Sequence, residues 1–188
     1  AHAKEGKEAY IVAKMNSLCD WQIIEKLYEA SSVGVEIYLV IRGICCLRTG
    51  IPGVSEHIHV TSIVGTFLEH SRIFYLYNNG QEDIYMGSAD WMPRNLDRRV
   101  EIVFPVEDDV IKDRIKHILD VLLRDNLKAY AMLSDGTYAK MSRRGKQAIG
   151  AQMTFCREAM EGAKEETTVW KGRRFIPIWA FDEEEHEA

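Results

Sequence analysis

Hydrophobic and polar positions near the start of the chain form segments whose lengths fit a strand, a helix and a second strand. Residues 9–15 (AYIVAKM) are a short apolar run typical of a buried strand, and residues 35–41 (VEIYLVI) are rich in β-branched side chains. Between them, apolar side chains recur at helical spacing: Trp21, Ile24, Leu27 and Tyr28. This pattern predicts a helix capped by Asn16 or Ser17 that ends near Ser31. Strand, helix and strand with short joints predict a parallel βαβ unit.

Farther along, the pattern predicts a hairpin, another strand and two helices. Residues 71–77 and 83–86 form the hairpin, because Asn79-Gly80 between them is a tight-turn sequence. Residues 99–105 predict a further strand, and apolar residues at helical spacing predict a long helix that begins at Asp108 or Asp109. The remaining predictions are a glycine-punctuated loop at 42–56, a turn at 134–136, a basic loop at 142–146 and a helix at 147–163.

Composition is that of an ordinary globular protein, with 188 residues, 46% hydrophobic and 28% charged. The net charge of −5 comes from the last seven residues, 182–188, which hold five acids; without them the balance is 24 − 24 = 0. We therefore expect one domain over residues 1–181 and a disordered acidic tail. The neutral body disfavours nucleic-acid binding, and no apolar run approaches the length of a membrane span. The four cysteines include an adjacent pair, which suits reduced thiols of a cytoplasmic protein better than a disulfide framework.

The clearest candidate chemistry lies at the two ends of the predicted hairpin. Antiparallel pairing brings His70 and Arg72, at the start of the first strand, close to the small-residue loop 87–90 that contains Ser88. An imidazole, a guanidinium, a hydroxyl and loop amides suit a phosphate. Arg42 follows the apolar strand 35–41, at the sheet edge where open α/β sheets bind ligands. We expect Arg42 and His70 to share one anion pocket.

Other motifs indicate less. His57 and His59 alternate on one predicted strand but lack a third ligand at standard spacing, so a zinc site is not expected. Phosphate-loop and dinucleotide motifs are absent. The arginines around Asn95 (Arg94, Arg98 and Arg99) are interpreted as a strand entry held by ion pairs.

Long motifs in the chain resemble the last domain of bacterial polyphosphate kinases of the phosphohistidine type. The likeness covers about residues 10–150. The motifs that carry it are KMNSL (14–18), RGICCL (42–47), GIPGVSE (50–56), SIVG (62–65), FLEHSRIF (67–74), SADWM (88–92) and RNLDRRVE (94–101). Thr66 departs from the family, which usually has arginine after SIVG.

The resemblance implies an α/β fold with a phospholipase D-like mixed sheet flanked by helices. It also implies reversible transfer of the terminal phosphoryl group of ATP to inorganic polyphosphate, with Mg²⁺ held by residues outside this chain. It implies that Arg42 and His70 contact nucleotide phosphates, with His70 as the candidate catalytic residue. Together with Arg72 and Ser88 from the hairpin ends, they are the predicted ATP or phosphate ligands. The phosphohistidine would lie in an upstream domain that this chain lacks, so we expect weak anion binding and no kinase turnover from the chain alone. The full enzyme is expected to be a cytoplasmic homo-oligomer, peripheral to the inner membrane at most.

Two alternatives stay open from the sequence. One is a stand-alone phospholipase D-like phosphodiesterase with His70 as its nucleophile. In that case His70-Ser71-Arg72 and the loop 87–90 would represent the two phosphodiesterase motifs, although the acid expected after the first is missing. The other is a non-catalytic assembly domain whose apolar end, residues 175–181, packs on another subunit.

Overall fold

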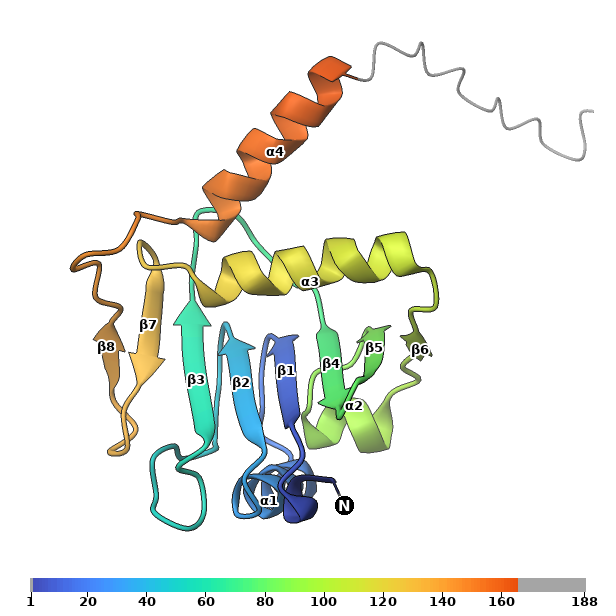
Figure 1. Cartoon of the computed structure of the whole chain (residues 1–188), viewed down its shortest axis with the longest axis vertical. Coiled ribbons are helices and arrows are strands. Elements are labelled where there is room, and N and C mark those ends of the chain that lie inside the picture. The colour runs from blue at the N-terminus through green and yellow to red at the C-terminus, as the bar shows by residue number, and fades with distance from the viewer. Residues whose placement is uncertain (1, 166–188) are drawn as a thin grey trace, which may run out of the picture. The chain divides into compact units, whose positions relative to one another are not determined.

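A computed structural model describes residues 2–165 as a mixed eight-stranded sheet with helices on both faces (Figure 1). The strand order is β6-β5-β4-β1-β2-β3-β7-β8. The strands are β1 (Ala9–Met15), β2 (Glu36–Ile41), β3 (Ile58–Ile63), β4 (Ile73–Asn78), β5 (Gln81–Gly87), β6 (Val103–Pro105), β7 (Ala129–Met132) and β8 (Tyr138–Lys140). The helices are the short 3₁₀ helix η1 (His2–Glu5), α1 (Trp21–Ser31), α2 (Pro93–Arg98), α3 (Asp109–Leu123) and α4 (Ala151–Glu165). The predicted α/β class is confirmed.

The predicted βαβ unit is present at the centre of the sheet. β1 and β2 pair in parallel from Tyr10 opposite Glu36 to Met15 opposite Ile41. The predicted helix cap was wrong: α1 begins at Trp21, and the carboxylate of Asp20 accepts a hydrogen bond from the first-turn amide. The cap moves because the chain stays extended after Ser17: Leu18 forms β-bridges with Cys45 and Trp91, so the helix cannot begin before Asp20.

The predicted hairpin is confirmed as β4 and β5. Its turn uses Asn79 and Gly80, which both have positive φ angles of 49° and 95°, as a tight hairpin requires. β4 pairs antiparallel with β1, which places the start of β4 beside the end of β1. This pairing decides which loops meet at the sheet edge.

The segment after β5 differs from the prediction. Residues 93–98 form the short helix α2, and only Val103–Pro105 of the predicted strand 99–105 pairs with β5. α2 was missed because its polar six-residue sequence carries no helical periodicity; Pro93 at its first turn was the available signal. α3 begins after Asp108, as predicted, and α4 begins at Ala151 within the predicted helix 147–163.

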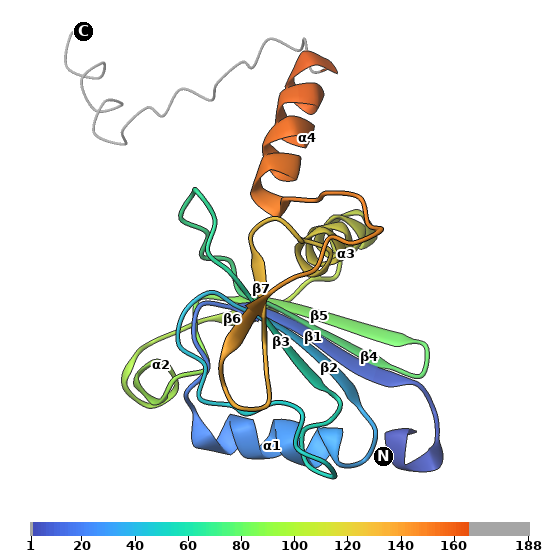
Figure 2. The same cartoon turned by 90° about the vertical axis from the view of Figure 1, so that its left-hand side faces the viewer.

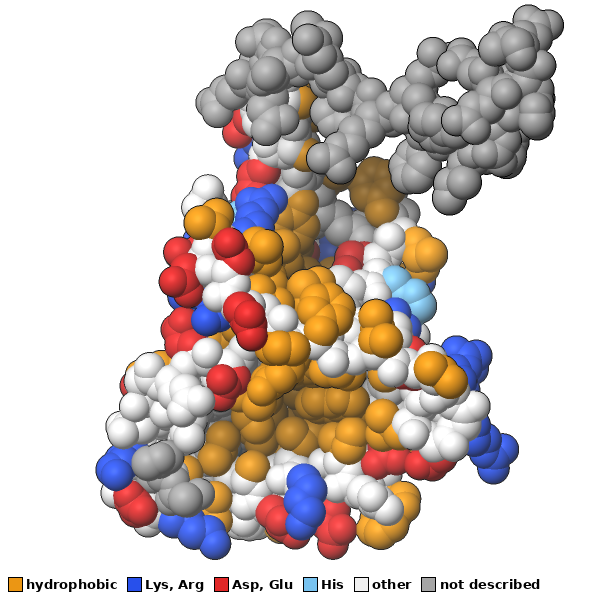
Figure 3. Space-filling model, turned by 90° about the vertical axis from the view of Figure 1, so that its right-hand side faces the viewer, with side chains coloured by type: hydrophobic (Ala, Val, Ile, Leu, Met, Phe, Trp, Pro, Cys, Tyr) orange, Lys and Arg blue, Asp and Glu red, His pale blue; other side chains and the backbone are white. Residues whose placement is uncertain are grey.

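The hydrophobic core lies on both faces of the sheet. Figure 2 shows α1 and α3 on opposite sides of the strands. Leu27 of α1 packs with Ile37 and Leu39 of β2, whereas Ile115 and Leu119 of α3 pack on the other face. Hydrophobic side chains also gather over the face that presents the β6 edge (Figure 3). The central strands are thus packed on both faces, and the loops at their ends start from buried elements.

The described residues fall into two units. Residues 2–155 form the first, which contains the sheet, and residues 156–165 of α4 belong to the second. Among residues 2–165, no helix has the length and hydrophobicity needed to cross a bilayer. The predicted acidic tail, 182–188, and the apolar segment 175–181 lie outside the described residues.

Candidate functional site

The ends of three central strands meet at one edge of the sheet. Because β1 and β2 run parallel and β4 runs against them, Asn16 after β1, Arg42 after β2 and Arg72 before β4 emerge at the same side. Ser88, which follows β5, emerges beside Arg72 because β5 pairs antiparallel with β4. The topology alone therefore gathers the predicted ligands at one edge.

Arg72 and Asp90 form the buried centre of this edge. Nε and Nη2 of Arg72 donate to Oδ1 and Oδ2 of Asp90 at 3.2 and 3.1 Å, a two-point contact between planar groups. Asp90 is 2% exposed, and its Oδ1 also accepts from the amides of Asn16 and Ser17 at 2.8 and 3.3 Å. Burial opposes ionisation of Asp90, but the hydrogen bonds from Arg72 and the two amides hold its pKa below the ordinary value.

His70 is exposed and is held from one side by Arg72. Nη2 of Arg72 lies 2.8 Å from Nε2 of His70, and Nη1 donates to the His70 carbonyl oxygen at 3.0 Å. Every N–H group of arginine is a donor, so the ring nitrogen Nε2 must accept. This contact favours the tautomer of His70 that carries its proton on Nδ1.

Arg42 reaches the same cluster through Asn16. Its Nη1 donates to Oδ1 of Asn16 at 3.2 Å, and the amide of Asn16 donates to Asp90. A continuous line of contacts thus runs from Arg42 through Asn16, Asp90 and Arg72 to His70. The structure brings Arg42, His70 and Arg72 to one edge.

Ser88 belongs to a neighbouring network at the end of β5. Its hydroxyl donates to the carboxylate of Glu101 and accepts from the amide of Ile102 at 3.1 Å. The other oxygen of Glu101 accepts from Nδ2 of Asn95 at 2.6 Å. Hydrogen bonds from Ser88 and Asn95 lower the pKa of Glu101. The hydroxyl of Ser88 is therefore already bonded within the protein.

Two residues of the site were not found from the sequence. Lys14 of β1 is 2% exposed; it pairs with Glu69 and donates to the carbonyl of Ser71 at 2.9 Å. Asn16 joins Arg42 to the buried carboxylate. A lysine inside an otherwise apolar strand was the available signal, because a buried ammonium group needs a partner.

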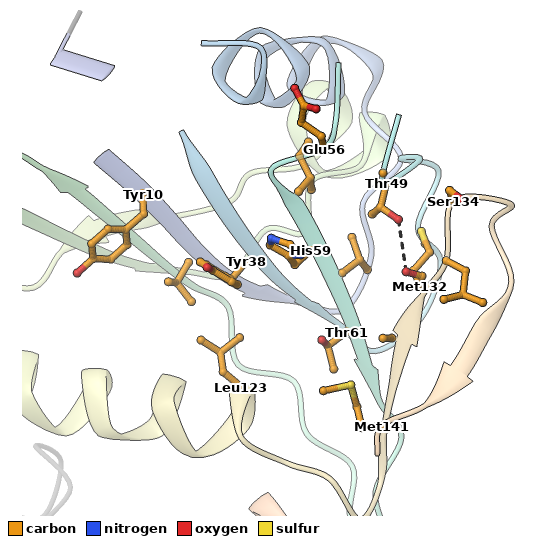
Figure 4. A pocket seen from close by; sticks show the side chains of 16 residues that line it. Tyr10, Tyr38, Thr49, Glu56, His59, Thr61, Leu123, Met132, Ser134 and Met141 are labelled. Carbon is orange, nitrogen blue, oxygen red and sulfur yellow. Dashed lines mark hydrogen bonds between the residues drawn. The ribbon is translucent and has the colours of Figure 1, made fainter. Parts of the chain in front are cut away.

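A hollow lies away from this edge, on the open sheet face beside α3. It has a volume of about 830 Å³ and is lined mainly by apolar side chains; Figure 4 shows Tyr38, His59 and Leu123 among the residues around it. None of the four predicted ligands lines it. Its chemistry does not suit a polyanion, so the candidate site is the charged edge and not this hollow.

The fold and this edge define an α/β domain that gathers guanidinium and imidazole groups at the ends of its central strands. The sequence profile of the family described as "Polyphosphate kinase C-terminal domain 2" matches residues 1–152. The chain belongs to this family.

Similar proteins agree with the family. Polyphosphate kinase of Thermosynechococcus vestitus is 57% identical over 137 residues, which cover 73% of this chain and 19% of that protein. Polyphosphate kinase of Lactiplantibacillus plantarum is 48% identical over 182 residues, covering 95% of this chain and 25% of that protein. The crystal structure of polyphosphate kinase from Porphyromonas gingivalis superposes with a TM-score of 0.82 at 42% identity, covering 88% of this chain and 25% of that one. The chain thus spans about a quarter or less of these relatives.

Proposed function

We propose that this chain acts within a polyphosphate kinase, where it helps to transfer the terminal phosphoryl group of ATP reversibly to inorganic polyphosphate. The family match and the similarity to polyphosphate kinases support this function over the phosphodiesterase and assembly alternatives. Since the chain corresponds to a quarter or less of its relatives, the reaction belongs to a longer protein. In this proposal the phosphohistidine is supplied by an upstream domain.

The observation that carries the proposal is the convergence of Arg42 and His70 at one sheet edge. Phosphoryl transfer depends mostly on positioning and on neutralising charge around the moving group. Arg42 uses Nη1 for Asn16, and its other N–H groups suit phosphate oxygens. His70 offers Nδ1–H, the donor that Arg72 leaves available. Together they would hold a chain of phosphates from two sides.

Arg72 and Ser88 enter the proposal in different positions. The guanidinium of Arg72 is 13% exposed and already bonded to Asp90 and His70, so its positive charge acts on the phosphates from behind the imidazole. Ser88 is bonded to Glu101, and a phosphate ligand role would require that hydroxyl to turn. We rank Arg42 and His70 as the direct contacts.

Mg²⁺ is expected from the family. Among residues 2–165, no group of three or more His, Cys, Asp or Glu side chains is arranged to hold a metal ion. The proposal therefore names no Mg²⁺ ligand among residues 2–165, and no step of it passes through the ion. Homo-oligomerisation of the longer enzyme stays a prediction.

Calorimetric titration of the 188-residue chain with inorganic tripolyphosphate tests the proposal. We expect weak binding that Arg42→Ala and His70→Ala each reduce about tenfold, as the loss of one charge-assisted hydrogen bond predicts. Arg48→Ala is the matched control, because Arg48 donates to the carbonyl of Asp135 on another hairpin. Unchanged binding in both Arg42→Ala and His70→Ala would refute the proposed contacts. Polyphosphate synthesis by the chain alone would refute an upstream phosphohistidine.

A further inference from the structure

One buried carboxylate organises both candidate phosphate contacts. Asp90 accepts four hydrogen bonds: two from Arg72, and one each from the backbone amides of Asn16 and Ser17. Its side chain is 3% exposed, so these contacts replace the water that an ionised carboxylate would otherwise bind. Such a group cannot reach a ligand, and its effect on chemistry must pass through its partners.

Arg72 contacts both Asp90 and His70, and so determines where the imidazole lies. The two-point contact fixes the plane of the guanidinium, which points Nη2 at Nε2 of the imidazole. Nη1 donates to the carbonyl oxygen of the same histidine, so both the ring and its backbone are located by one side chain. A lysine could supply the charge but not this planar set of donors.

We propose that Asp90 and Arg72 are positioning residues that fix His70 as the neutral tautomer with its proton on Nδ1. Nδ1 has no hydrogen-bond partner within residues 2–165, and the His70 side chain is exposed. The tautomer therefore presents an N–H donor to an incoming phosphate oxygen. This inference rests on the proposed role of His70 as a phosphate contact and adds how that contact is prepared.

Asp90 also positions Arg42, the second candidate phosphate contact, through Asn16. The Asn16 amide is held by Asp90, and the Asn16 side chain accepts from Arg42. Loss of the charge at Asp90 would thus loosen both groups, whereas loss of Arg72 would release His70 and leave the Asn16 amide bonded to Asp90.

Nitrogen-15 NMR of the histidine-labelled 188-residue chain at pH 8.5 tests the tautomer directly. That pH lies about two units above the ordinary histidine pKa. His70→Gln assigns the signal by its disappearance. We expect wild-type Nδ1 to be protonated and Nε2 unprotonated. In Arg72→Met we expect a mixture of tautomers, since the second nitrogen no longer has a donor opposite it.

Further variants test whether the His70 tautomer depends on Arg72 and Asp90. Arg48→Met is the control and should leave the His70 signal unchanged. Arg72→Lys keeps the charge and should restore the tautomer only in part. Asp90→Asn should alter the His70 signal and weaken tripolyphosphate binding about tenfold; circular dichroism reports whether it folds, and Arg72→Met provides the test if it does not.

Two outcomes would overturn different claims. A proton on Nε2 in the wild type, or an unchanged signal in folded Arg72→Met, overturns the positioning role even if tripolyphosphate binds through His70. A proton on Nδ1 that depends on Arg72, with no response of His70 to tripolyphosphate, supports the positioning role and overturns the proposed phosphate contact.

Discussion

The ammonium group of Lys14 on β1 is paired with the carboxylate of Glu69, 55 residues later in the chain, in the loop that leads into β4. The same ammonium donates to the carbonyl of Ser71 at 2.9 Å, and Glu69 accepts from the Ser71 amide at 2.9 Å. Lys14 is almost fully buried, whereas Glu69 is one-third exposed. The segment that carries His70 is therefore tied to the central strand on one side and to Asp90 through Arg72 on the other.

Replacing Lys14 with methionine should destabilise the chain and loosen this segment. The side-chain volume is kept, but Glu69 and the Ser71 carbonyl lose their donor, and we expect a loss of about 2 kcal/mol after allowing for the partial exposure of Glu69. Urea unfolding of the 188-residue chain measures the loss. Lys26→Met is the control, because Lys26 pairs with Glu29 on the surface of α1 and should leave the midpoint unchanged. Equal midpoints for the two variants would contradict a structural role of the buried pair.

Acid should lower the folding stability of the chain by protonating Glu69 and Asp90, the two carboxylates that hold the segment with His70. Burial opposes ionisation of Glu69, but hydrogen bonds from Lys14 and Ser71 hold its pKa below the ordinary 4.5, and the pKa of Asp90 is likewise below 3.8. A carboxyl whose pKa is lower in the folded state stabilises the fold above its unfolded pKa, and this contribution is lost as the pH falls through the folded value. The stability of the wild type should therefore decline steeply below about pH 4.5.

The pH series is best measured against Glu69→Gln. This variant should be less stable than the wild type by about 1 kcal/mol at pH 7, and the difference should shrink as the pH falls below 4. Urea midpoints at half-unit steps from pH 3 to pH 7 measure it. A difference that is constant over this range would show that the ionised form of Glu69 contributes no stability.

Much of the fold could be predicted because its central elements have strong local patterns. The apolar run of β1 is typical of a buried strand, and the apolar residues of α3 recur at helical spacing. Asn79-Gly80 specifies the turn between β4 and β5. The cap of α1 could not be predicted, since Asn16, Ser17 and Asp20 are all suitable caps locally. Tertiary contact decides between them: β-bridges of Leu18 with Cys45 and Trp91 keep the chain extended, which leaves Asp20 to begin the helix.

The sequence allowed us to predict that Arg42 and His70 belong to the candidate site, but not that Asn16 and Asp90 join them. The convergence of Arg42 and His70 follows from strand directions, which short connections and a hairpin turn reveal in sequence. Asn16 and Asp90, which join them, make contacts between loops 74 residues apart, and no local periodicity encodes such a pair. The partner of Lys14 was hidden for the same reason.

Gly87 should tolerate no side chain, because β6 passes close to it. A Cβ atom there would lie 2.7 Å from the carbonyl oxygen of Ile102 and 3.0 Å from Cγ2 of Val103. Gly87→Ala should therefore push β6 away from β5, strain the Ser88–Glu101 contact and cost about 1–3 kcal/mol in urea unfolding. Gly162→Ala in α4, where the added Cβ meets no atom within 4 Å, should cause no loss. Full stability of Gly87→Ala would contradict the close approach.

Two thiols, Cys45 in the loop that carries Arg42 and Cys19 beside it, should resist alkylation in the folded chain. Burial, followed by the hydrogen bond with Cys46, raises the pKa of Cys19 to about 11, and burial raises that of Cys45 to about 11. At pH 8 about one in a thousand of these thiols is then ionised, and the greater nucleophilicity of a more basic thiolate offsets this only in part. Iodoacetamide should modify both at least about tenfold more slowly than in the urea-unfolded chain, as peptide mass spectrometry can measure. Equal rates for Cys45 in the folded and unfolded chain would contradict its partial burial in the loop that carries Arg42.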